Sequence, residues 1–175
     1  MTGLSRASVI AALCTIAGTP SLAGPERVVF PASYAKDFLH YNTVDRPDRK
    51  RVRLLYVNAT AHAAARPGEP LPYGTILVME DRDAAVDESG NLKRDNEGRL
   101  IPTDIVSNVF VMEKQKGWGE AFSASIRNGD WDYAWYLADG MPKADATFDG
   151  CFSCHLPRRE KDFTFTYWTN VKEMK

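Results

Sequence analysis

Cys151-Phe152-Ser153-Cys154-His155, near the C-terminus, is the stretch that decides what kind of fold this chain forms. Two thiols at this spacing can each add to one vinyl group of the same haem, and the histidine that follows is then held beneath the iron as an axial ligand. The string therefore predicts one covalently attached haem c, bound through Cys151 and Cys154, with His155 as the iron ligand. Because the string comes late, most of the fold precedes it.

A redox-active thiol pair and half of a zinc site are the alternative interpretations of this string. A thioredoxin-like pair needs no histidine in the fifth position, and it lies between a strand and a helix near the start of its domain. A zinc site needs two further ligands, and only His40 and His62 remain as histidines outside the string. Haem attachment explains more of these residues than either alternative.

The first 23 residues have the pattern of a secretory signal peptide. Arg6 is their only basic residue, and the uncharged stretch after it has an apolar centre too short for a membrane span. Ala23 and the serine two positions before it are the small residues that a signal peptidase recognises, so we expect cleavage before Gly24. A c-type haem is attached after export, so the signal and the motif together predict a periplasmic protein made of residues 24–175.

Composition sets limits but adds little chemistry. The roughly 150 residues after the signal make one domain with a sizeable core. The formal net charge of the chain is −1, which gives no reason to expect nucleic acid or an anionic membrane as a partner. No apolar stretch after the signal is long enough to span a membrane. Residues 81–104 are rich in charged side chains and contain two glycine turns, so we expect a surface excursion or a loosely formed hairpin there.

Around this segment the sequence pattern is mainly that of an antiparallel sheet. The spacing of aromatic residues predicts a helix at 33–41, and Asn58 is expected to cap a second helix that continues through Ala65. The expected fold class is α+β, mainly antiparallel β: a single small domain with a five-stranded type of sheet, a few helices and a C-terminal haem motif. Apolar runs between turn signals place strands at 51–57, 74–80, 105–113, 131–137 and 163–168.

Several segments together resemble the cytochrome P-460 family, which includes the β-type cytochromes c-prime. They are Leu-Leu-Tyr-Val-Asn at 54–58, Leu-Pro-Tyr-Gly-Thr-Ile-Leu-Val-Met-Glu at 71–80, Gly-Asp-Trp at 129–131, the haem string, and Asp-Phe-Thr-Phe at 162–165. The resemblance implies a small antiparallel β domain, usually a homodimer, with one five-coordinate high-spin haem. The open side of that haem would bind nitric oxide or hydroxylamine, and a redox partner cytochrome would exchange electrons with it.

One departure from the family pattern bears on function. Members that oxidise hydroxylamine carry a lysine joined covalently to the haem macrocycle, which we place in a Gly-Thr-x-x-x-Lys-Glu strand. Here the matching residue is Met79, whose thioether cannot form that bond. The resemblance then favours a cytochrome that binds nitric oxide or a related small nitrogen ligand. Four lysines in charged or turn-rich sequence, where solvent exposure is expected, are nominal alternatives for the cross-link: Lys50, Lys93, Lys114 and Lys116.

Two alternative functions stay open. One is an oxidoreductase that acts on hydroxylamine or nitric oxide, as in the family members with the cross-link. The other is a His/Met electron carrier in which Met79 is the sixth iron ligand, although a methionine in an apolar strand is more typical of core packing. Weaker ligand candidates are Met112, Met141, His40 and His62.

Other residues are candidates for contacts around the haem. An aromatic cap over the open side would admit a neutral diatomic and exclude water, and the aromatic stripe at 131, 133 and 135 is either core or haem wall. Arg158 and Arg159 are candidates for pairing with the haem propionates, or else belong to a solvated loop. The cap candidates are Phe30, Phe38, Phe110 and Phe122.

Overall fold

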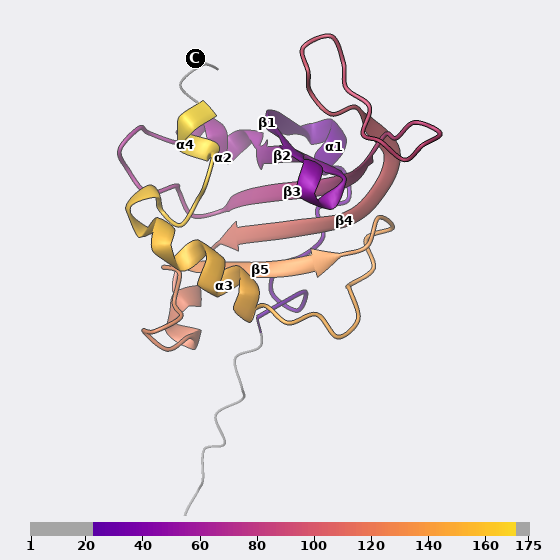
Figure 1. Cartoon of the computed structure of the whole chain (residues 1–175). Helices are drawn as coiled ribbons and strands as arrows, with labels where there is room; N and C mark the ends of the chain where they lie inside the picture. Colours follow the sequence, from indigo (N-terminus) through magenta and orange to yellow (C-terminus); the bar gives the residue numbers. More distant parts are fainter. Residues whose placement is uncertain (1–22, 171–175) are drawn as a thin grey trace, which may run out of the picture.

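The computed structural model describes residues 23–170, so the predicted signal peptide, apart from Ala23, lies outside the described residues. Within this range the chain builds one five-stranded antiparallel sheet whose strands follow one another in sequence order (Figure 1). The predicted α+β, mainly antiparallel β class of a single small domain is confirmed. The strands are β1 (Phe38–Arg46), β2 (Arg51–Asn58), β3 (Thr75–Ala84), β4 (Pro102–Lys114) and β5 (Trp131–Tyr136).

Short helical segments flank the sheet. The α-helices are α1 (Tyr34–Asp37), α2 (Ala59–Ala64), α3 (Asp149–His155) and α4 (Tyr167–Asn170), and the 3-10 helices are η1 (Pro47–Arg49), η2 (Trp118–Ala121) and η3 (Leu156–Lys161). Among the described residues, no helix is long and apolar enough to cross a membrane.

Four of the five predicted strands are confirmed, because 51–57, 74–80, 105–113 and 131–137 fall on β2, β3, β4 and β5. The charged segment 81–104 is partly sheet, since β3 continues to Ala84 and β4 already begins at Pro102. Its remaining residues form tight turns held by the isolated bridges Val86–Leu92 and Arg94–Leu100. They project from the sheet as two loops between β3 and β4 (Figure 1).

The predicted helix at 33–41 is wrong beyond its first turn. Helix α1 ends at Asp37, and Phe38 begins β1, which pairs antiparallel with β2. Tyr34 is buried in the core on one side of the sheet, whereas Tyr41 packs against the core on the other side. A helix would have placed the two rings on one face. Pairing with β1 satisfies the backbone N–H and C=O groups of β2, which would otherwise be the open edge of the sheet. This gain outweighs the helical preference that the aromatic spacing indicates.

The predicted strand at 163–168 is also wrong. Asp162 and Phe163 have positive φ angles of 50° and 59°, and helix α4 begins at Tyr167. The period-two pattern fails in burial as well, because Phe163 is 6 % exposed and Phe165 is 39 % exposed. This segment makes its contacts through a turn beside the motif helix and pairs with none of the strands of the described chain.

Helix α2 follows Asn58 as predicted, but Asn58 does not cap it through a side-chain hydrogen bond. Instead, Asn58 Nδ2 donates to the carbonyl of Gly74 at 3.0 Å, and its Oδ1 accepts from the N–H of Ile76 at 2.9 Å. The amide therefore ties the end of β2 to the start of β3.

The two faces of the sheet bury two different apolar clusters. On one face, Val28 and Tyr34 from the N-terminal segment and α1 cover Tyr56, Val78, Val111 and Ala134. On the other face, which we call the motif face, α3 and the segment after it cover a row of four paired residues. This row consists of Val57, Leu77, Met112 and Tyr133.

Candidate functional site

The motif occupies helix α3, which packs against β5. Cys151, Cys154 and His155 stand at positions i, i+3 and i+4, so their side chains share one side of the helix. Phe152 anchors the buried side, with its ring 4.9 Å from that of Tyr133. The His155 ring is 5.1 Å from the same tyrosine. Figure 1 shows the helix lying along β5, so the motif is placed directly on the motif face.

Both motif thiols are free rather than joined in a disulfide. Burial raises the pKa of Cys151 to about 11, and Cys154 adds to the shift by repulsion. A thiol of this kind forms little thiolate at neutral pH, whereas redox-active pairs need a lowered pKa. The site therefore fits thioether formation better than a thioredoxin-like role.

The zinc interpretation also fails on geometry. His40 Nε2 lies 3.0 Å from the hydroxyl of Thr43, and the His62 ring contacts Tyr167. Within residues 23–170 no three His, Cys, Asp or Glu side chains come together as a metal-binding group.

His155 is oriented as an iron ligand requires. Its Nδ1 lies 2.6 Å from the backbone carbonyl of Phe163. A carbonyl can only accept a hydrogen bond, so Nδ1 carries the proton and Nε2 keeps its lone pair. Burial lowers the pKa of His155, which favours the neutral ring, although the hydrogen bond to Phe163 opposes the shift. A neutral imidazole with one nitrogen anchored to the backbone has the arrangement of a metal-ligating histidine.

Asn128 connects the motif helix to the sheet through hydrogen bonds. This side chain is fully buried, and its Nδ2 donates to the hydroxyl of Tyr133 at 2.8 Å and to the carbonyl of Phe152 at 3.1 Å. The next residue, Gly129, has a φ of 59°, and a Cβ there would lie 3.1 Å from the Phe163 ring. The Asn-Gly turn before β5 thus brings together the helix, the strand and the residue that binds His155.

A second row of the motif face lies next to the buried row and is more open to solvent. Leu55 pairs with Met79, Met79 with Phe110, and Phe110 with Trp135, so all four side chains point to the same face. Leu55 is 8 % exposed, and the other three are partly exposed. We call this row the platform. It begins at Trp135, two residues or roughly 7 Å along β5 from the tyrosine that contacts His155.

The four cap candidates differ in whether they belong to the platform. Only Phe110 belongs to it, with its ring 4.9 Å from that of Trp135. Phe30 and Phe38 pack against the core of the opposite face, and Phe122 is buried against Phe152 in the motif-face core. The aromatic stripe divides in the same way: Trp131 and Tyr133 are core, and Trp135 is platform.

The three methionine candidates also lie in different surroundings. Met79 lies within the platform, on the face that carries the motif. Met112 is buried beneath the motif helix, and Met141 is 61 % exposed in the loop after β5.

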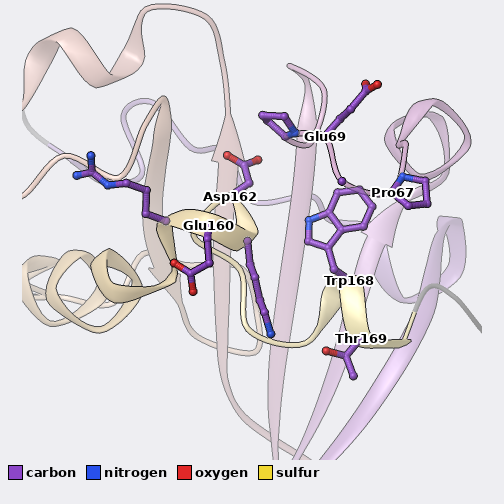
Figure 2. A pocket seen from close by; sticks show the side chains of 10 residues that line it. Pro67, Glu69, Glu160, Asp162, Trp168 and Thr169 are labelled. Atoms are coloured by element: carbon purple, nitrogen blue, oxygen red, sulfur yellow. The ribbon is translucent and has the colours of Figure 1, made fainter.

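Of the two arginine candidates, Arg158 lies nearer to His155. Its guanidinium is 4.8 Å from the Phe165 ring, which in turn contacts the His155 ring at 5.0 Å. Arg159 lines a groove of about 570 Å³ between the 67–70 loop, η3 and α4. Figure 2 shows Trp168 and Pro67 in that groove opposite Glu160 and Asp162. No motif or platform residue lines the groove, so it is separate from the candidate site.

The expectation that Lys114 is solvated is wrong. It is 6 % exposed, and its Nζ lies 2.8 Å from Asp162 Oδ2. Lys50, Lys93 and Lys116 are exposed, as expected for lysines in charged or turn-rich sequence. A lysine that the sequence did not single out, Lys143, has its Nζ 6.0 Å from the centre of the platform Trp135 ring.

The free thiols, the anchored neutral imidazole and the adjoining apolar platform fit a haem bound on the motif face. The family model described as Cytochrome P460 matches residues 31–166, a range that includes the motif, the platform and Phe163. A comparison with curated proteins gives no match.

Proposed function

The chain belongs to the cytochrome P460 family and is a haem cytochrome, and from this premise we propose that it is a mono-haem c-type cytochrome that binds nitric oxide or a related small nitrogen ligand. Cys151 and Cys154 would hold the haem by thioether bonds, and His155 would be the axial ligand. When bound, a haem with one protein ligand supplies an iron with an open sixth position for a small ligand. The other features of the proposal concern what the chain itself does around that position.

The hydrogen bond between His155 and Phe163 supports this assignment. It fixes the tautomer and the orientation of the ring, and it makes Nε2 a better electron donor. Tyr133 and Phe165 pack on the ring at 5.1 and 5.0 Å and keep it from rotating.

The composition of the platform is the observation that carries the choice of ligand. Its four members are apolar or aromatic, and the position expected for a cross-linking lysine holds Met79 between Leu55 and Phe110. Such a surface offers a polar substrate such as hydroxylamine no free hydrogen-bond donor, because the indole N–H of Trp135 is already bonded to Asn108 at 2.8 Å, whereas a neutral diatomic needs none. This supports a gas-binding cytochrome that lacks the lysine–haem bond.

The proposal includes location and assembly. The pattern of the first 23 residues supports export to the periplasm. The family resemblance supports a homodimer and exchange of electrons with a partner cytochrome. Light scattering of the purified protein tests the first of these: a monomer mass would remove the homodimer from the proposal.

One observation favours a second candidate, the hydroxylamine or nitric oxide oxidoreductase. Lys143 is exposed and lies beside Trp135, so an amine is available at the edge of the platform. A bond from this lysine to the macrocycle would take the place of the missing one at Met79.

An optical spectrum, a nitric oxide titration and peptide mapping of the purified protein test these functions together. We expect a high-spin resting haem, an ordinary c-type ferrous spectrum, stoichiometric nitric oxide binding and no hydroxylamine-dependent dye reduction. A far-red ferrous band with a lysine–haem peptide would establish the oxidoreductase instead.

The matched variant Met79→Leu keeps the apolar volume and removes the sulfur. It should leave the spectrum unchanged. A low-spin, six-coordinate spectrum that Met79→Leu converts to high spin would establish a His/Met electron carrier.

A further inference from the structure

A buried ion pair lies on the motif face at the end of the sheet where β4 finishes, opposite the loops of 81–104. Lys114, the last residue of β4, donates from Nζ to Asp162 Oδ2 and to the carbonyl of Leu71, both at 2.8 Å. The same Asp162 oxygen accepts from the N–H of Leu71 at 2.8 Å. The two charged side chains are only 8 % and 10 % exposed. One ammonium thus joins a strand, the loop before β3 and the segment after the motif.

The segment that is held in this way has an unfavourable backbone conformation. Asp162 and Phe163 both have positive φ, which L-residues with a side chain rarely adopt. Three contacts keep the turn in place: the ion pair at Asp162, the buried Phe163 ring, and the Phe163 N–H bonded to the Arg158 carbonyl at 2.8 Å. The turn presents the Phe163 carbonyl to Nδ1 of His155.

We propose that Lys114 is a positioning residue for the axial histidine, acting through Asp162 and the Phe163 carbonyl. The inference rests on the proposed function, in which His155 binds the haem iron. A short Nδ1–H···O=C bond shifts electron density toward Nε2, and more basic ligands favour ferric over ferrous iron. Lys114 therefore sets the strength of that bond and, through it, the reduction potential.

Stability alone is a weak explanation for this ion pair. The free energy lost when two charges leave water is about as large as the free energy gained from their attraction. An apolar pair of similar volume often gives a protein of equal stability. What the pair adds is a fixed position for one residue of a strained turn. That turn is directly joined to the carbonyl on which His155 depends.

The test is Lys114→Met in the haem-loaded protein, with Lys114→Arg as the conservative variant. We expect Lys114→Met to raise the midpoint potential and to lower the iron–histidine stretching frequency in resonance Raman spectra. A residue that acts through a second one should change the ferric/ferrous ratio by less than about tenfold, or about 59 mV for one electron. Lys114→Arg keeps the charge and should return both readouts toward the original protein.

Arg82→Met is the matched control, because Arg82 pairs with the buried Glu80 on the opposite face of the sheet. If Lys114→Met shifts the two readouts no further than Arg82→Met does, the positioning role is refuted and the proposed function is untouched. If the haem is not thioether-bound, or if the ferrous protein has no iron–histidine band, the proposed function itself fails. If Lys114→Met does not fold, Asp162→Asn is measured in its place. This variant keeps an acceptor for Leu71, and an unchanged potential in it equally refutes the inference.

Discussion

Ionisation of the buried Asp132 should lower the free energy of unfolding as the pH rises. The variant Asp132→Asn should remove this loss. The carboxylate lies in β5 and is fully buried. Its Oδ1 accepts from the Tyr133 N–H at 2.7 Å, whereas Oδ2 has no hydrogen-bond partner among residues 23–170 and lies 3.3 Å from the Arg27 guanidinium. Burial raises the pKa of Asp132 to about 6, against the smaller opposing effects of the Tyr133 N–H, the Arg27 charge and the Gly24 N–H.

The sign and the size follow from this pKa. The folded protein binds the proton more tightly than the unfolded chain, so the contribution to stability is fully present below pH 3.8 and is lost as the pH rises through about 6. At 1.36 kcal/mol per pKa unit, the loss reaches about 3 kcal/mol by pH 8. An asparagine imitates the protonated acid and keeps the acceptor for Tyr133, so Asp132→Asn should be about 3 kcal/mol more stable than the original protein at pH 8 and equal to it near pH 4.

Urea unfolding at several pH values between 4 and 8, on both haem-loaded proteins, measures this difference. Titration of other groups is shared by the two proteins and cancels. Arg27→Met is the control: it removes the opposing charge, so it should raise the pKa of Asp132 further and weaken the protein above pH 6. An Asp132→Asn variant that is no more stable at pH 8, or a difference independent of pH, would refute the reasoning.

Three further predictions concern haem attachment, the support of the motif helix and export. Cys151→Ala or Cys154→Ala should weaken or abolish covalent attachment; if acid–acetone extracts haem from the unmodified protein, the thioether assignment is wrong. Asn128→Ala should lower the free energy of unfolding by about 2–3 kcal/mol, because it leaves the buried Phe152 carbonyl without its donor and removes a second bond to Tyr133; a urea midpoint equal to that of the unmodified protein would contradict it. The intact mass of the exported protein should equal residues 24–175 plus one haem, and a chain that still begins at Met1 in the membrane fraction would indicate an uncleaved anchor.

The sequence predicted the parts of this protein that depend on local patterns. The motif string places the three candidate haem-binding side chains within five residues, so helical spacing alone brings them to one side of α3. The runs that became β2 to β5 show their strand character because each is apolar and bounded by turn residues. The partner that holds the second nitrogen of His155, the Phe163 carbonyl, was not among these local patterns.

The expectations that failed depended on distant residues. The segment at 38–46 forms a strand because β2 offers it an edge, and no feature of its own sequence decides this. The residues at 162–165 alternate like a strand but turn away, because Asp162 is held by a lysine 48 positions earlier. Lysines are usually exposed, so sequence alone gave Lys114 the wrong surroundings.

By itself, then, the sequence determined the haem motif, the class of fold and the absence of lysine at position 79. Only the tertiary structure decided that Phe110 is the cap candidate on the motif face, that the Phe163 carbonyl binds His155, and that Lys114 supports it. The physical reason is range. Thioether spacing and strand patterns are properties of neighbouring residues, whereas the platform arises from strand register, and the support of His155 arises from a backbone turn and a buried charge pair that close only when the sheet has formed.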